Sequence, residues 1–199
     1  MSPAKLGSLI GAAFGLLFVL LNTGGLPGVA ATGLRAGAGL VFLAVLLAAF
    51  AHGGKDVHPP SGPAPQGGFG RGYWAVVAGE AVALWGGLAV LNGPLDTPDA
   101  GVAWVSFVVG AHFLGLAVVW RQRVFVGLAV VLSACGLAGL GLAALGSRQQ
   151  AVEVVGGVVP GAVLLAVAGW TTARANGWGG AGSAAGTGPR PPASRGMRR

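Results

Sequence analysis

The chain has 199 residues, of which 54% are hydrophobic and only 9% are charged, and its mean hydropathy is +0.75. Globular proteins carry about 25% charged residues, so this chain has too few charges to cover a water-facing surface. The 39 glycines follow no three-residue repeat, which excludes collagen, and the high apolar content excludes a disordered chain. The composition predicts an all-α integral membrane protein.

Six apolar stretches approach or reach the roughly 20 residues that a membrane-spanning helix needs. In chain order they cover residues 6–21, 29–51, 73–91, 101–120, 124–146 and 154–172. The first is short and could instead be the apolar region of a signal peptide behind Lys5. No good cleavage site follows it, and its removal would leave an odd number of spans. We therefore predict a polytopic bundle of six transmembrane helices in residues 1–173.

The basic residues indicate how this bundle is oriented. With the N-terminus in the cytoplasm, ten of the twelve bases fall on the inner side, as the positive-inside rule requires. These ten are Lys5, Lys55, Arg71, Arg121, Arg123, Arg174, Arg190, Arg195, Arg198 and Arg199. Arg148 is alone in an outer loop, whereas the loop 92–100 carries Asp96 and Asp99. Both termini are expected to be cytoplasmic, with Arg121 and Arg123 anchoring the topology and Trp104 lying near an outer boundary.

Two polar segments flank or interrupt the spans. Residues 52–72 are rich in proline and glycine and predict a flexible cytoplasmic loop, and residues 174–199 predict a disordered basic tail. Because the bases are spread over inner loops and this tail, they fit topology and anionic lipid and give no nucleic-acid surface. The expected partners are the lipid bilayer and either another membrane protein or a second copy of the chain.

The sequence lacks the motifs of common enzymes and cofactor sites, including a Walker loop, HExxH, CxxC and GxSxG. Cys135 is the single cysteine and lies in an apolar span, where it is expected to be a small buried hydrophobe. His52 and His58 have no neighbouring ligands that would complete a metal site. We expect no enzymatic activity, no cofactor and no metal.

Glycines at four-residue spacing predict close helix packing, because small residues let helix backbones approach each other in lipid. They are Gly7, Gly11 and Gly15 in the first span, Gly33 and Gly37 in the second, and Gly157 and Gly161 in the sixth. Packing within the chain is expected, with a dimer interface as the alternative. Pro160 is expected to kink the sixth span; such broken helices line substrate sites in transporters and are packing irregularities elsewhere.

Polar residues at membrane depth are the candidate functional residues, because an ionisable group there costs about 2.5–3.5 kcal/mol. Glu80 and His112 lie roughly 10 Å and 12 Å from the inner boundary on adjacent spans, so they are predicted to pair. The pair could be a proton relay, a cation gate or a static interhelical hydrogen bond. Arg35 is expected to be an orientation anchor that either snorkels to the surface or pairs with Glu153.

The segment Val108-Val109-Gly110-Ala111-His112-Phe113-Leu114 and the turn Arg121-Gln122-Arg123 resemble a group of small multi-pass bacterial membrane proteins. Those proteins carry a VVGxHFL-like segment on a late helix, followed by a basic turn and another span. The abundance of glycine, alanine, valine and arginine is also similar to actinobacterial proteins. The resemblance implies a helical bundle in a bacterial plasma membrane and no reaction. The expected function is structural or partner-binding, with a small proton-linked transporter or channel as the alternative.

Overall fold

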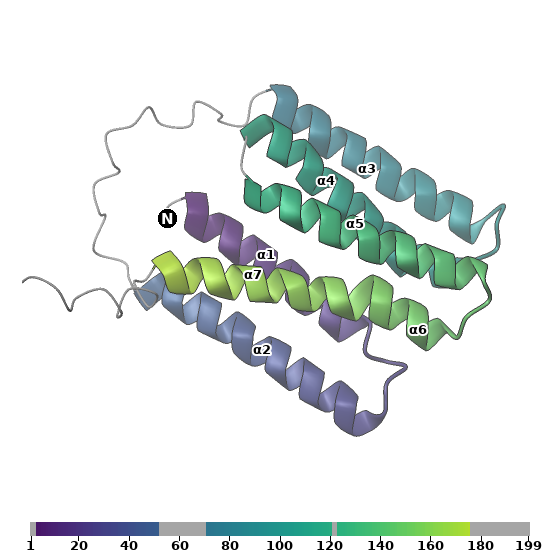
Figure 1. The fold of residues 1–199 in the computed structure, drawn as a ribbon, viewed down its shortest axis with the longest axis horizontal. Helices are drawn as coiled ribbons and strands as arrows, with labels where there is room; N and C mark the ends of the chain where they lie inside the picture. The colour runs from purple at the N-terminus through teal and green to yellow at the C-terminus, as the bar shows by residue number, and fades with distance from the viewer. Residues whose placement is uncertain (1–2, 52–70, 121–122, 176–199) are drawn as a thin grey trace, which may run out of the picture.

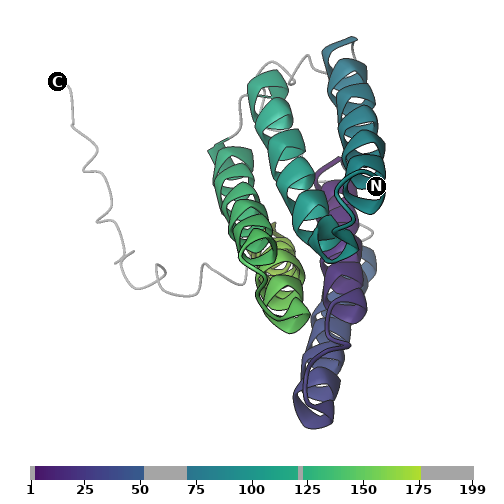
Figure 2. The same cartoon turned by 90° about the vertical axis from the view of Figure 1, so that its right-hand side faces the viewer.

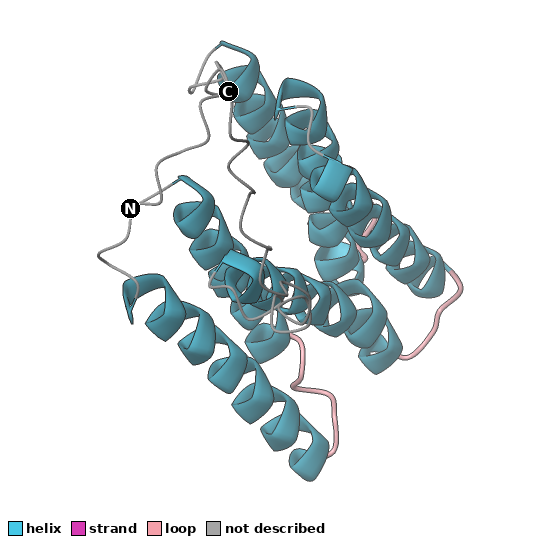
Figure 3. Ribbon diagram, turned by 60° about the vertical axis from the view of Figure 1, so that its left-hand side comes forward, coloured by secondary structure: helices cyan, strands magenta, loops and turns pink. Residues whose placement is uncertain are grey.

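The structure, a computed structural model, describes residues 3–51, 71–120 and 123–175. Arg121 lies outside these ranges, as do most of the predicted loop 52–72 and of the predicted tail 174–199. Every regular element in the described ranges is helical (Figure 3). The elements are α1 (Pro3–Leu21), α2 (Gly28–Ala51), α3 (Arg71–Asn92), η1 (Pro98–Ala100), α4 (Gly101–Trp120), α5 (Arg123–Ala144), α6 (Gln149–Glu153), η2 (Val154–Val158) and α7 (Val159–Ala175).

The predicted all-α bundle is confirmed, and the protein is a multi-pass membrane protein. In the part of the chain that the structure describes, five helices are long and apolar enough to cross a membrane: α2, α3, η1 with α4, α5, and the continuous stretch from α6 to α7. The apolar part of α1 is shorter, from Lys5 to Leu21. The predicted first span therefore exists as a helix, but it falls below the usual spanning length.

The helices form two groups that share α7 (Figures 1 and 2). In one group, α1 and α2 pack against α7 through a core of Ala12, Val19, Ala38, Val45, Leu165 and Ala168. In the other, α4 and α5 pack tightly together, and α5 contacts α7 through Leu128, Leu132 and Leu164. Helices α2 and α3 lie at opposite edges of the bundle. As a result, α7 is central, and α3 is attached to the rest almost wholly through α4.

Several predicted boundaries differ from the structure because hydropathy does not record how a helix ends. Helix α5 was predicted to reach residue 146 but ends at Ala144, where Gly146 adopts a positive φ of 66° that closes the turn. The last span was predicted over 154–172, yet the helix runs from Gln149 to Ala175. Its ends are polar, so the apolar pattern alone missed them.

The predicted irregularity at Pro160 takes the form of a π-helical turn, Val154–Val158, immediately before the proline. Proline has no N–H, so the carbonyl of Gly156 loses its α-helical partner. The hydroxyl of Ser106, on α4, donates a hydrogen bond to this carbonyl. Ser106 and Pro160 are both fully buried. A side chain from one helix group thus satisfies the backbone group that proline frees in the central helix.

Three of the seven predicted packing glycines lie at helix contacts. A Cβ atom on Gly15 would lie 2.8 Å from the carbonyl oxygen of Gly161, and a Cβ on Gly161 would lie equally close to that of Gly15. The third, Gly157, contacts the side chain of Asn22. Only glycine permits α1 and α7 to approach this closely.

The other four glycines make no helix contact among the described residues, and the alternative of a dimer interface stays a prediction. Open space surrounds the Cβ positions of Gly7, Gly11, Gly33 and Gly37 within the described bundle. The inward face of α2 is formed instead by Ala31, Ala38, Val45 and Ala49. In a helix that is apolar on every side, the spacing of small residues does not identify the face that packs against the other helices.

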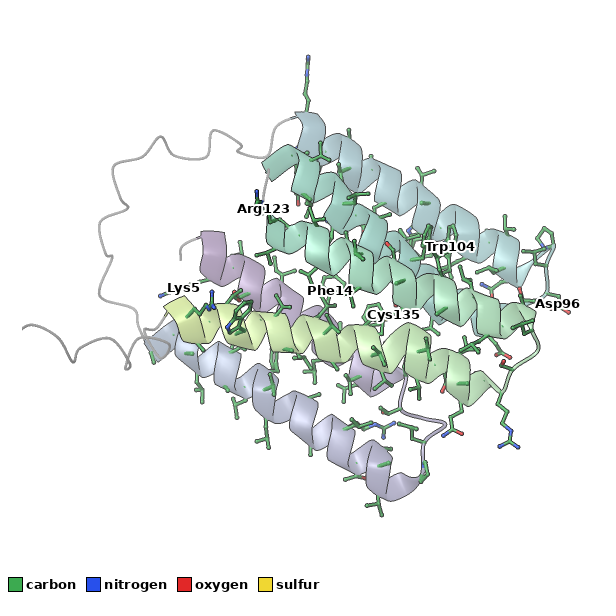
Figure 4. The ribbon with its side chains drawn as sticks, viewed as in Figure 1. Lys5, Phe14, Asp96, Trp104, Arg123 and Cys135 are labelled. Carbon is green, nitrogen blue, oxygen red and sulfur yellow. The ribbon has the colours of Figure 1, made fainter. Side chains whose placement is uncertain are left out.

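Charged side chains lie at both ends of the bundle. Lys5 and Arg123 lie at one end, and Asp96 lies at the other (Figure 4). Arg174 is at the same end as Lys5 and places its guanidinium 4.0 Å from the ring centroid of Trp170. A basic end and an end carrying a carboxylate agree with the alternation of charge expected from the sequence.

Candidate functional site

Glu80 and His112 meet in the structure, as their depths on adjacent spans predicted. Helices α3 and α4 run antiparallel through the short connection at η1, so residues at equal depth face each other. Glu80 Oε2 lies 2.8 Å from His112 Nδ1. This is a contact between an acidic and a basic side chain from neighbouring helices.

The contact is close, but it is not a well-directed hydrogen bond. Nδ1 of His112 is buried and has no hydrogen-bond partner of good geometry, so Oε2 lies off the direction in which a ring N–H would point. The side chains of His112 and Glu80 remain 17% and 26% exposed. The pair therefore keeps hydrogen-bonding capacity that the described residues leave unused.

Aromatic contacts hold the imidazole in place. His112 meets Phe113 edge to face with ring centroids 5.9 Å apart. Phe113 in turn stacks on Phe125 of α5 at 5.9 Å. These contacts connect the ring position to the α4–α5 interface, which is the most extensive in the bundle.

The pair lines a cavity of about 290 Å³ between α3 and α4, which is open on one side. The rest of its lining is apolar or aromatic and includes Gly79, Trp104, Phe107 and Gly115. At Gly79 the helix backbone leaves open space at the Cβ position. The site is thus an apolar groove with one pair of ionisable groups, which we call the α3–α4 groove.

Trp104 lines the groove and lies on the part of α4 nearer to its connection with α3 (Figure 4). Its indole Nε1 donates a hydrogen bond of 3.1 Å to the carbonyl oxygen of Ala83 on α3. The ring occupies the space beside Gly87, where any Cβ would collide with it. The sequence predicted a boundary residue here, and the structure adds a packing role that the spacing of aromatic residues alone did not indicate.

Helix α3 exposes most of its surface although it carries Glu80. Its one large helix partner is α4, and Trp74, Val82 and Trp85 are 61%, 74% and 72% exposed. At membrane depth such a surface meets either lipid or another membrane component. The face formed by α3 and α4, with the groove at its centre, is therefore a partly accessible polar site within the apolar part of the bundle.

Arg35 is held by a partner that the sequence did not suggest. Its Nε donates a hydrogen bond of 2.8 Å to Thr23 Oγ1, and Thr23 is fully buried in the connection between α1 and α2. Glu153, the partner considered from the sequence, instead accepts a bond of 3.0 Å from Gln149. Arg35 thus fixes the α1–α2 connection, which fits an anchoring role.

A second hollow of about 280 Å³ lies at the opposite end from Lys5, among the side chains of Asn22, Asp99, Gln149 and Glu153. It contains two carboxylates and lies beside the π-helical turn. Among the described residues, however, no three His, Cys, Asp or Glu side chains come together as a metal site would require. The intramembrane pair remains the stronger candidate site.

Comparisons of the chain with protein-family models, with characterised proteins and with solved structures found no match. The functional inference therefore rests on the geometry of the α3–α4 groove.

Proposed function

We propose that the chain is a non-enzymatic integral membrane protein that binds another component of the membrane through the face formed by α3 and α4. The observation that carries this proposal is the Glu80–His112 pair, which opens on the outer surface of the bundle at membrane depth. A partly exposed ionisable pair in contact with lipid chains is unfavourable. Its cost is several kcal/mol, roughly the cost of inserting one or more ionisable residues into the membrane. A bound component that covers the groove would remove that contact.

The sparse attachment of α3 supports the same proposal. If the groove served only to hold α3 against α4, a directed hydrogen bond and full burial of the pair would serve better than the partly exposed contact observed. A face kept open by Gly79, with polar groups in its floor, is instead suited to an additional ligand.

The proposal is tested by the reactivity of Glu80 toward dicyclohexylcarbodiimide, a lipid-soluble reagent that modifies carboxyl groups at membrane depth. Labelling is measured by mass spectrometry in membranes of the organism that makes the protein, and again after purification into nanodiscs of synthetic phospholipid. We expect Glu80 to be protected in native membranes and labelled in nanodiscs, with Glu153 as the internal reference. Equal labelling of Glu80 in the two preparations would contradict the proposal.

A proton-linked transporter is the second candidate, and the 2.8 Å approach of a carboxylate to an imidazole favours it specifically. Such a pair can exchange a proton. Proton flux into proteoliposomes is measured for the wild type and for Glu80→Gln. Flux that is present in the wild type and lost in the variant would support transport, whereas no flux through either would leave binding as the function.

We further propose that the bundle resides in the plasma membrane of a bacterium with both termini in the cytoplasm. The basic end that carries Lys5 and Arg123 supports this orientation through the positive-inside rule. A cysteine introduced at Arg148 should react with an impermeant maleimide from outside intact cells, whereas one introduced at Lys5 should react only after the cells are opened.

A further inference from the structure

We propose that the α3–α4 groove binds a small, neutral, lipid-soluble molecule whose hydroxyl group is carried on an aromatic ring, that is, a phenol. This inference rests on the proposed function, because it names the class of membrane component that covers the Glu80–His112 pair. It follows from the size of the groove, the chemistry of the pair and the aromatic side chains beside it.

The size of the groove fits a small molecule. Its volume of about 290 Å³ is just below the range for ligand sites, which begins at roughly 300 Å³. A transmembrane helix, about 10 Å across with its side chains, would instead lie along α3 for several turns. The groove is local: its lining residues on α3 lie between Val76 and Ala83, and one turn further along α3 the Trp104 ring fills the space beside Gly87.

The polar groups of the groove determine which polar group the ligand carries. The Glu80 carboxylate accepts hydrogen bonds, whereas the His112 imidazole can donate one or accept one. A hydroxyl group both donates and accepts through a single oxygen, so it can contact both side chains, reaching the imidazole through Nε2 because Nδ1 is buried beside Glu80. An anion would be repelled by Glu80, and a permanently charged cation would not reach this depth through lipid.

The walls of the groove select the body of the ligand. Trp104 and Phe107 line it with ring centroids 5.7 Å apart and planes inclined by 37°. Their edges and faces offer a third ring the offset or edge-on contacts that aromatic groups prefer. At Gly79 no side chain obstructs the approach from the open side. A phenol entering from the bilayer can therefore place its ring on these walls and its hydroxyl on the pair.

The first experiment measures protection of Glu80 from dicyclohexylcarbodiimide in synthetic nanodiscs as 4-hexylphenol is added. Hexylbenzene, which has the same shape but no hydroxyl, is the matched control for partitioning into lipid. We expect saturable protection by 4-hexylphenol at a concentration roughly tenfold or more below any effect of hexylbenzene, the ratio that one or two hydrogen bonds supply. Protection by both compounds equally, or by neither, would overturn the inference.

The second experiment separates a small ligand from a partner helix, using two glycines with open Cβ positions on the same face of α3. Gly86 lies seven residues after Gly79, about 10 Å along the helix, and does not line the groove. A leucine at position 86 would obstruct a helix that packs along α3 but not a small molecule beside Glu80. We expect Gly86→Leu to retain the protection of Glu80 in native membranes.

The outcomes distinguish the two proposals. Loss of native protection in Gly86→Leu would overturn the phenol site in favour of a partner helix. Native protection without any effect of 4-hexylphenol would leave the proposed function standing and reject the phenol. Protection by 4-hexylphenol without native protection would support the site and reject the proposed function. Circular dichroism of Gly86→Leu confirms that the variant is folded before it is interpreted.

Discussion

Ser106→Ala removes the hydroxyl that donates to the carbonyl of Gly156, the backbone acceptor that Pro160 deprives of its usual partner. Because Ser106 is fully buried, no water replaces the lost donor. An unsatisfied buried acceptor costs about 1–3 kcal/mol, whereas interhelical hydrogen bonds in membranes are worth about 0.6–1.7 kcal/mol. We therefore expect Ser106→Ala to lower the free energy of unfolding by about 1–2 kcal/mol.

The same reasoning predicts that this cost depends on Pro160. In a Pro160→Ala background the residue at position 160 regains an N–H that can donate to the Gly156 carbonyl, so the serine becomes dispensable. Unfolding free energies are measured for the wild type, both single variants and the double variant by titration of mixed micelles with dodecyl sulfate, followed by circular dichroism. We expect Ser106→Ala to cost less than about 0.5 kcal/mol in the alanine background, which gives a coupling of about 1 kcal/mol. Equal costs in the two backgrounds would refute the role assigned to the hydroxyl.

Two further predictions test the helix contacts. Gly15→Leu should destabilise the bundle by about 2 kcal/mol or more, because its side chain would collide with the Gly161 backbone, whereas Gly11→Leu, one turn away in open space, should change stability by less than about 0.5 kcal/mol. Similar unfolding curves for these two variants would contradict the contact between α1 and α7. Trp104→Phe should lower the free energy of unfolding by about 1 kcal/mol through loss of the hydrogen bond to Ala83. The same titration measures this change, and an unchanged unfolding midpoint would show that the hydrogen bond contributes nothing to stability.

The sequence sufficed for the existence of five spanning helices among the described residues and for the contact between Glu80 and His112. Hydropathy over some 20 residues marks a helix in lipid regardless of its neighbours, which is why α4 matches its predicted range of 101–120. The ionisable pair was predictable because the two residues lie at equal depth on consecutive antiparallel helices, and ionisable groups at membrane depth pair with one another. The spans follow from the local hydropathy pattern, and the Glu80–His112 contact follows from the geometry of the single hairpin formed by α3 and α4.

The features that the sequence did not indicate depend on which helix faces meet. Gly161 contacts α1 and Gly157 contacts Asn22 just after it, but Gly33 and Gly37, with the same spacing, face open space. In lipid the outward and inward faces of a helix are equally apolar, so no periodicity separates them. Ser106 was missed for the related reason that its acceptor lies 50 residues away on the central helix.

The most direct test of the account is the extent of carbodiimide modification of Glu80 in native membranes relative to that in synthetic nanodiscs. If the face formed by α3 and α4 binds a component of the membrane, the modified fraction of Glu80 will be several-fold lower in native membranes, while Glu153 reacts alike in both. Equal modification of Glu80 in the two preparations would show that nothing covers the pair and would contradict the account.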